Sequence, residues 1–411
     1  MGSKSIFEKY DLTTLILALL LVATGIIAIY SATFANSGTG TSFYTKQLTF
    51  AFISVFMVFA IVYIPPRYIA LSAYYLYGFS IFLLIAVLVF GKTINGNKSW
   101  FYIAGFGIQP SEFTKITVLL AISKYLNFGE EKKDINNPVV FIKTMAFLLL
   151  PVILIKLQHD TGTSIVFLTM SIPILWAAGL SPFTMFAIIT PIVLAVLSFL
   201  NPVYFYVGLG VSVIILLLFK RNLFSSIIVF VINVISGLSV NFLFSKLAVY
   251  QQQRVFAMFD PSADPLKSGY NVIQSKVAIG SGGLFGKGYL QGTQTQLKFI
   301  PEQWTDFIFC MIGEEFGFIG SMILILIFCL LIYRLFKTGM NTINSYMGLI
   351  TIGFGGLFLF HLVINIGMTV GLFPVIGIPL PLISYGVSSL LSFMAMIGLA
   401  LNTYKTRNQF I

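Results

Sequence analysis

Carboxylates are scarce in this chain, with 13 Asp and Glu among 411 residues, so those beside long apolar segments are the first candidates for chemistry. A charge at the edge of such a segment, or inside it, is costly and is usually kept for a function. Five residues fit this description: Glu112, Asp160, Asp306, Glu314 and Glu315. For each of them the alternative is a helix-end residue that meets water, or a structural ion pair.

Asp306 follows the polar run 301–305 and opens an apolar segment. A carboxylate in this position could accept a proton from a hydroxyl nucleophile. A helix N-terminus stabilises the charged carboxylate and so lowers its pKa. The role of base therefore requires some desolvation, which raises the pKa again. The alternative is an ordinary charge at the start of a helix. Glu314 and Glu315 lie two to three turns deeper, too far along the helix to share a proton with Asp306.

Glu112 and Lys115 are three residues apart, which places them on one face of a helix where they can neutralise each other. We interpret the pair as structural, shaping a cavity without touching substrate. Ser384 is not in a nucleophile elbow, and no covalent catalytic triad can be assembled. His159 and His361 are the two histidines, and no metal-ligand spacing is present, so the sequence predicts no metal site.

A glycine-rich run, 280–288, lies in a strongly basic polar segment. It fails as a Walker motif, because Ser281 replaces the first glycine and Gly288 follows the lysine. Glycines still let backbone amides approach an anion such as a pyrophosphate. Attraction to acidic lipid headgroups is the competing explanation. The basic residues of the segment are Arg254, Lys267, Lys276, Lys287 and Lys298.

The elements that position these residues are predicted to be membrane helices, since 58% of the residues are hydrophobic, 9% are charged and the mean hydropathy is +0.96. Apolar runs of about 17 to 25 residues recur, each long enough to cross a bilayer core of about 30 Å. Twelve runs are candidate spans: 12–30, 48–64, 68–90, 111–127, 141–157, 162–178, 181–199, 203–219, 224–246, 306–335, 345–369 and 380–402. The expected fold is an all-α integral membrane protein, a polytopic bundle of about 10–12 transmembrane helices in one domain, 1–411.

The net charge of +11 does not indicate nucleic-acid binding, because Lys and Arg lie mostly in short segments between apolar runs. Their distribution follows the positive-inside rule if both termini are cytoplasmic. Residues 247–305 then form one long extracellular loop. Its apolar residues predict partly helical structure lying against the membrane.

Several patches resemble, in order along nearly the whole chain, the motifs of the SEDS family (shape, elongation, division, sporulation). The amino-acid sequence of the long loop is closer to that of the RodA branch of this family than to that of the FtsW branch. The patches are Gln109–Glu112 with Lys115, Asp160 with Gly162 and Thr163, Gly269–Leu284, Gly286–Gly288, Gly292–Leu297, Phe299–Glu302, Thr305–Phe309, Gly313–Glu315 and Pro379–Gly386.

This resemblance implies a peptidoglycan glycosyltransferase of the bacterial cytoplasmic membrane, serving wall elongation and cell shape. Such proteins polymerise lipid II on the outer face, and Asp306 matches their essential acid. One base and no covalent intermediate fit inversion at C1 of MurNAc. Arg254, Lys276 and Lys287 could neutralise the leaving undecaprenyl pyrophosphate, with or without a divalent cation such as Mg or Mn. The implied partners are a class B penicillin-binding protein, other membrane proteins of the elongation complex and membrane lipids.

The chain departs from the family pattern at His159, Thr161, Trp304 and Val387, none of which removes a carboxylate. The family typically has ten spans, so 203–219 with 224–246 are read as an inserted pair. Two alternatives stay open. A flippase for lipid II is suggested by the many spans and intramembrane charges, although no internal symmetry is evident. A non-enzymatic scaffold for the transpeptidase would not need Asp306.

Overall fold

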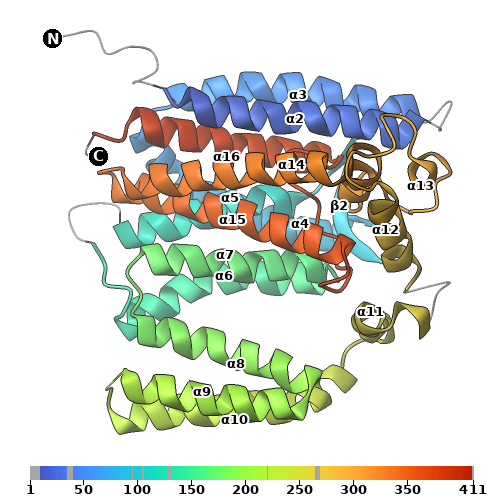
Figure 1. Cartoon of the computed structure of the whole chain (residues 1–411). Helices are drawn as coiled ribbons and strands as arrows, with labels where there is room; N and C mark the ends of the chain where they lie inside the picture. Colours follow the sequence, from blue (N-terminus) through green and yellow to red (C-terminus); the bar gives the residue numbers. More distant parts are fainter. Residues whose placement is uncertain are drawn as a thin grey trace. The chain divides into compact units, whose positions relative to one another are not determined.

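The computed structural model describes residues 10–34, 40–94, 96–103, 106–127, 132–219, 221–263 and 269–409 (Figure 1). Each of the twelve predicted spans corresponds to a helix in these ranges. Nine of the described helices are long and apolar enough to cross a membrane, which confirms an all-α polytopic architecture. The other three are α5, α7 and α9. The bounds of the twelve are α2 Leu12–Phe34, α3 Gly40–Tyr63, α4 Pro66–Phe90, α5 Pro110–Asn127, α6 Pro138–Leu157, α7 Thr161–Ala177, α8 Pro182–Leu200, α9 Pro202–Leu218, α10 Leu223–Ser245, α14 Ile308–Met340, α15 Ser345–Thr369 and α16 Val387–Lys405.

Contacts divide the chain into two compact units, residues 1–178 with 257–411 and residues 179–256. The prediction of one membrane domain, 1–411, stays a prediction. The second unit contains α8, α9 and α10, which pack on one another. Ser198 Oγ of α8 donates to Gly237 O of α10 at 2.8 Å, and Gly237 gives Phe205 of α9 room to pack. The predicted inserted pair corresponds to α9 and α10 within this unit.

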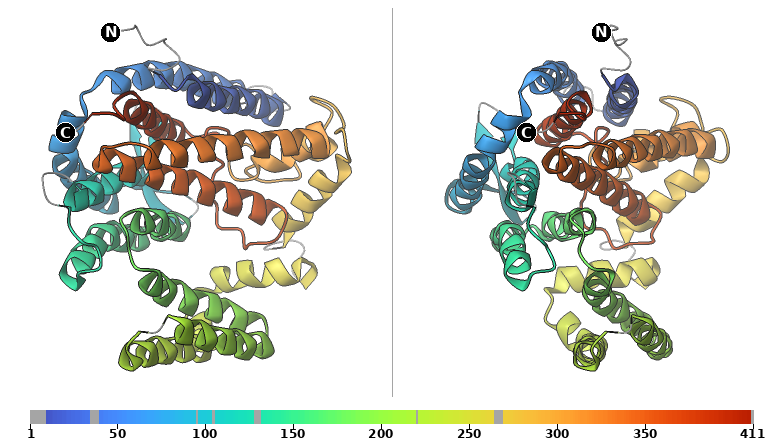
Figure 2. Two further views of the ribbon diagram at one scale, coloured as in Figure 1. Left: turned by 60° about the vertical axis from the view of Figure 1, so that its left-hand side comes forward. Right: turned by 90° about the vertical axis from the view of Figure 1, so that its left-hand side faces the viewer.

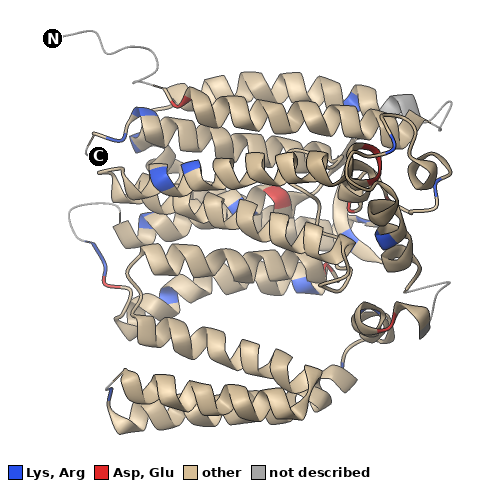
Figure 3. Ribbon diagram, viewed as in Figure 1, with Lys and Arg blue, Asp and Glu red and all other residues tan. Residues whose placement is uncertain are grey.

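The core of the first unit is formed by α15 and α16, the most buried of the nine long helices. Helix α15 contacts α5, α7, α14 and α16, and the views of Figure 2 agree on its central place among them. Small residues permit this close packing. A Cβ on Gly353 would lie 2.7 Å from Leu119 of α5, and one on Gly356 would lie 2.3 Å from Pro173 of α7. Charged residues gather toward the helix ends, and few lie midway (Figure 3).

Smaller elements lie in the connections between the long helices. The segment after α10 is partly helical, as predicted, with α11 Val249–Phe259, a 3-10 turn Pro261–Ala263, α12 Tyr270–Ser281 and α13 Thr293–Gln296. A three-stranded antiparallel sheet between α4 and α5 was not predicted. Its strands are β1 Lys92–Ile94, β2 Asn97–Ile103 and β3 Phe106–Ile108, and they lead directly into α5.

The last helix and α14 differ from the predicted spans in ways that have a local backbone cause. The last helix begins at Val387 instead of residue 380, because Leu380 and Leu382 lie in a turn in which Leu382 has φ of 64°. Helix α14 is interrupted at Gly317, which has φ of 67° and ψ of −163°. Apolar composition does not reveal either feature, since a turn buried in protein can be as hydrophobic as a helix.

Candidate active site

Asp306 lies in the turn before α14, half-buried, and the backbone of this turn is held by the segment that precedes α16. Trp304 O accepts a hydrogen bond from Tyr385 N at 2.9 Å. Thr305 O accepts one from Ser384 Oγ at 2.6 Å, and the same hydroxyl accepts from the backbone N–H of residue 380 at 2.8 Å. Ser384, predicted to bind substrate or shape the cavity, therefore ties the Asp306 turn to the segment that precedes α16.

The third consecutive carbonyl, that of Asp306 itself, is bound by Asn365 of α15. Asn365 Nδ2 donates to Asp306 O at 2.9 Å and to Ile378 O at 2.7 Å, so both amide hydrogens are used. Its side chain is fully buried. We call Asn365, Ser384 and Tyr385 the C-terminal clamp. Sequence reasoning missed Asn365, although an amide inside an apolar helix was an available signal.

The carboxylate of Asp306 lies against Gly377, where φ is 70°. A Cβ added to Gly377 would lie 3.2 Å from Asp306 Oδ2, so glycine leaves room for the carboxylate. Aromatic rings pack beside the same turn. Phe43 of α3 stacks on Trp304 with centroids 5.5 Å apart and meets Tyr385 edge-on at 5.0 Å. These three rings form an apolar wall beside the turn.

Glu112 and Lys115 form the predicted ion pair, with Lys115 Nζ 2.8 and 2.9 Å from the two carboxylate oxygens. Both side chains are buried in the first unit. Ser392 of α16 donates to Glu112 Oε2 at 3.1 Å, and Lys115 Nζ lies 5.0 Å from the centre of the Phe393 ring. The pair thereby joins α5 to α16. The charges are compensated locally, as a buried ion pair requires.

Asp160 caps the N-terminus of α7. It accepts hydrogen bonds from Thr163 N at 3.0 Å, Thr163 Oγ1 at 2.8 Å and Gln109 Nε2 at 3.0 Å. Burial raises the pKa of the Asp160 carboxyl above its ordinary value, and the bonds from Thr163 oppose that rise. The contact with Gln109 links the entry of α7 to the residue that precedes α5.

Glu314 is fully buried and anchors the long loop to α14. Its carboxylate accepts from Lys287 Nζ at 2.8 Å, Gln294 N at 2.9 Å, Thr295 N at 2.9 Å and Thr295 Oγ1 at 2.8 Å. Lys287 is therefore committed to an ion pair. This arrangement gives both residues a structural explanation.

Glu315, also buried, binds a different part of the structure. Ser31 Oγ of α2 donates to it at 2.6 Å, and Leu290 N donates at 3.2 Å. Adjacent carboxylates on α14 thus hold the loop from two sides and connect it to α2.

The glycine-rich segment packs against α14 beside its interruption at Gly317. Lys287 N and Gly288 N donate to the carbonyls of Glu314 and Glu315 at 3.0 Å each. A Cβ on Gly286 would lie 2.1 Å from Glu315 O, so only glycine permits this approach. The amides of Lys287 and Gly288, which we considered for an anion, are already occupied.

The remaining basic residues are dispersed. Lys276 of α12 is exposed and extends over Gly371, where a Cβ would lie 2.3 Å from its Cε. Lys298 is exposed, and Lys267 lies outside the described residues. Arg254 belongs to the second unit, is exposed and lies 5.7 Å from the centre of the Tyr250 ring. Within the described ranges, no three His, Cys, Asp or Glu side chains form a group that could hold a metal.

Comparisons with known proteins identify relatives along the whole chain. The family profile of the cell cycle proteins FtsW, RodA and SpoVE matches residues 11–207 and 204–409. Peptidoglycan glycosyltransferase RodA of Treponema pallidum (strain Nichols) is 34% identical, over 96% of this chain and 97% of that protein. Peptidoglycan glycosyltransferase MrdB of Escherichia coli (strain K12) is 33% identical, over 99% and 97%.

Solved structures agree. A chain of a peptidoglycan synthase complex that coordinates polymerization and crosslinking has a TM-score of 0.73 at 28% identity, covering 98% of this chain and 99% of that chain. The rod shape determining protein RodA of Thermus thermophilus has a TM-score of 0.65 at 25% identity, covering 98% of each. This chain therefore belongs to the FtsW/RodA/SpoVE family, the SEDS family that its motifs resemble, and it is RodA-like.

Proposed function

We propose that this chain is a peptidoglycan glycosyltransferase that polymerises lipid II into glycan strands on the outer face of the bacterial cytoplasmic membrane. Family membership and the names of the relatives support the reaction class. The observation that carries the proposal for the site is the turn of Asp306. Three consecutive carbonyls of this turn are held by the C-terminal clamp, so the carboxylate is presented in a fixed place.

In the proposed reaction Asp306 is the general base. It accepts the proton of the GlcNAc 4-hydroxyl of the acceptor while that oxygen attacks C1 of the donor MurNAc. The bond between C1 and the pyrophosphate oxygen breaks, and undecaprenyl pyrophosphate leaves. A single displacement inverts the α-linked donor to a β-linked product. The lipid tails stay in the bilayer, since an isoprenoid chain gains nothing by leaving it.

Charge neutralisation of the pyrophosphate falls to Lys276 in this proposal, because its side chain is exposed. The role of Arg254, which belongs to the other unit, stays a prediction. Lys287 acts indirectly, by holding the loop through Glu314. Glu112, Lys115 and Asp160 shape the polar interior beside the site, and Glu315 fixes the loop on α2. A divalent cation that accompanies the substrate would share the work of neutralisation.

A class B penicillin-binding protein is the proposed partner, since glycan strands must be crosslinked. The likeness to a chain of a synthase complex supports such an assembly. Both termini of the chain are cytoplasmic in this proposal, and lipid II reaches the site from the outer leaflet. The RodA relatives of the chain favour a role in elongation and cell shape over a role in division.

The test is glycan synthesis from lipid II by the full chain reconstituted with its transpeptidase partner. Asp306→Asn should abolish polymer, whereas the matched control Glu302→Gln should retain it. Glu302 is an exposed carboxylate in the same turn. Polymer from Asp306→Asn at the wild-type rate would exclude Asp306 as the general base. Lipid II movement across vesicles without polymer from the wild type would favour the flippase, and neither activity would favour the scaffold.

A further inference from the structure

A small cavity lies at the end of α14 remote from Asp306. It has a volume of about 250 Å³. We call it the basic cavity, and it is lined by Arg334, Lys337, Thr338, Asn341, Tyr404 and Arg407. Helix α14 starts beside the Asp306 turn and is 33 residues long. At a rise of about 1.5 Å per residue, the cavity is therefore separated from the site by roughly the thickness of a membrane.

Three cations line the basic cavity without an acidic residue among its lining. Arg334 and Lys337 are three apart on α14, where like charges repel. Arg407 follows α16 and stacks on Tyr404 with its guanidinium carbon 3.9 Å from the ring centre. One carboxylate compensates in part, because Asp11 accepts from Arg334 Nη2 at 2.5 Å. Lys337 and Arg407 add two further cations to the same lining.

One donor of Arg334 makes no hydrogen bond among the described residues. This donor is Nε, which is buried. Guanidinium groups bind phosphate through several N–H donors at once. Hydroxyl and amide groups of Thr338, Asn341 and Tyr404 add uncharged partners beside the cations. This composition suits an anion with several oxygens.

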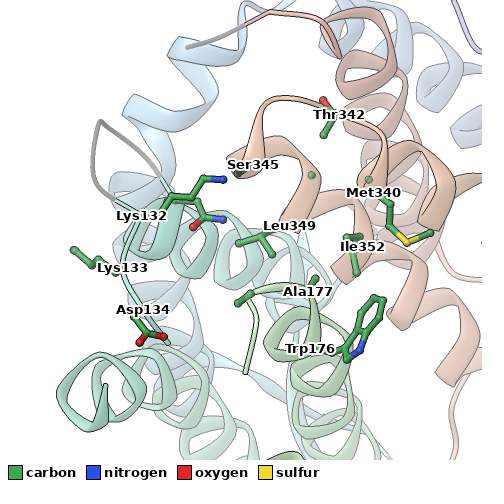
Figure 4. A pocket seen from close by; sticks show the side chains of 14 residues that line it. Lys132, Lys133, Asp134, Trp176, Ala177, Met340, Thr342, Ser345, Leu349 and Ile352 are labelled. Carbon is green, nitrogen blue, oxygen red and sulfur yellow. The ribbon is translucent and has the colours of Figure 1, made fainter. Parts of the chain in front are cut away.

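A neighbouring cavity shows that basic lining is not a general property of this end of the bundle. It has a volume of about 560 Å³ and uses other residues of the α14–α15 connection, such as Met340 and Ser345. Figure 4 shows Trp176 and Met340 on one side of it and Lys132, Lys133 and Asp134 on the other. Its charges are mixed, because Asp134 lies beside Lys132 and Lys133 in the lining. Lys132 therefore provides a matched cation at the same end of the protein.

We propose that the basic cavity binds the phosphate of an anionic phospholipid headgroup in the leaflet opposite Asp306. Its volume is below the roughly 300 Å³ of ordinary small-molecule pockets and suits a headgroup. Basic pockets between membrane helices on the cytoplasmic side are suited to such headgroups. The site is distinct from the proposed glycosyltransferase centre and does not depend on its chemistry.

The experiment measures lipid retention. Full-length wild type, Lys337→Gln, Arg407→Gln and the control Lys132→Gln are reconstituted in phosphatidylcholine bilayers with and without phosphatidylglycerol, extracted in mild detergent and analysed by native mass spectrometry. The wild type should retain phosphatidylglycerol preferentially. Removing Lys337 or Arg407 should weaken retention about fivefold each. Lys132→Gln should match the wild type, and Lys337→Arg should restore retention.

Equal losses in the Lys132→Gln control would reduce the effect to general surface charge and overturn the site. Unchanged retention in Lys337→Gln and Arg407→Gln would overturn the lipid site. The two cations would then be explained by the helix dipole and by membrane topology. A separate arm adds inorganic phosphate or glycerol 3-phosphate to detergent-solubilised protein. Thermal protection equal to that given by phosphatidylglycerol would assign the cavity to a soluble phosphate and overturn the lipid. Thermal unfolding in phosphatidylcholine verifies that each variant is folded.

Discussion

Asp306 and Glu314 belong to one segment of the chain, yet their surroundings differ. Glu314 is fully buried and receives hydrogen bonds from a lysine, two threonine hydroxyls and two backbone amides. Asp306 is half-buried, and the bonds that fix it reach its backbone and that of its neighbours. The Glu314 carboxylate anchors the long loop, whereas the backbone of the Asp306 turn is itself anchored by residues of other segments.

This difference separates a structural acid from a candidate base. A carboxylate that accepts four or more bonds in the protein interior is strongly held in its charged form and has little room for substrate. A carboxylate on a rigid backbone beside solvent can meet a hydroxyl group. Scarcity of acidic residues indicated both, and the bonds to its carboxylate support a structural role for Glu314.

The largest effect on stability should come from Glu314→Gln. This change leaves Lys287 unpaired and places an amide where two backbone N–H groups donate. Breaking a buried ion pair of this kind should cost about 3 kcal/mol. Thermal unfolding in detergent should show a Tm lower by roughly 5 °C or more. A wild-type Tm would mean that the loop is not anchored through Glu314.

Asn365→Leu tests the clamp from within the membrane core. Both hydrogen bonds of the amide are lost, and the Asp306 turn is freed from α15. Misplacement of a catalytic group by about 1 Å can cost about 100-fold in rate, so kcat should fall by that order while KM for lipid II changes little. Glycan synthesis under saturating and limiting lipid II separates the two constants. An equal rise in KM with unchanged kcat would contradict a positioning role.

Gly317→Ala tests the interruption of α14. Gly317 has φ of 67°, and a Cβ there would lie 2.2 Å from Gly286 N. We expect a loss of about 1–3 kcal/mol, because both the backbone and its neighbour must move. Gly280→Ala is the matched control, since nothing lies within 4 Å of its Cβ. Equal Tm values for the two variants would argue against the tight approach of the glycine-rich segment.

Ser384→Ala should have the smallest effect. It removes the donor to Thr305 O and the acceptor of the Leu380 N–H, and it leaves the bonds of Asn365 and Tyr385 to the turn in place. The loss of the one bond to the Asp306 turn costs about 1 kcal/mol, which corresponds to roughly a fivefold to tenfold lower rate. Polymer yield over time measures it. A complete loss of activity with a normal Tm would give the Ser384 hydroxyl a more direct role.

The sequence predicted the twelve helices and the Glu112–Lys115 pair, because apolar length and helical spacing are local properties. It did not predict that Lys287 pairs with Glu314, since these residues are 27 positions apart and meet through a turn of unusual glycine geometry. Asn365 was missed for a related reason. Its partners, Asp306 and Ile378, are known only once α15 and the turn before α14 are packed together.

The most direct measurement compares Asp306→Asn with Glu314→Gln, recording glycan synthesis from lipid II and thermal unfolding on the same preparations. Loss of a general base should lower the rate of Asp306→Asn about 100-fold to 10,000-fold. Its Tm should equal that of the wild type, whereas Glu314→Gln should lose stability. Polymer from Asp306→Asn at the wild-type rate, with an unchanged Tm, would contradict the assignment of the chemistry to Asp306.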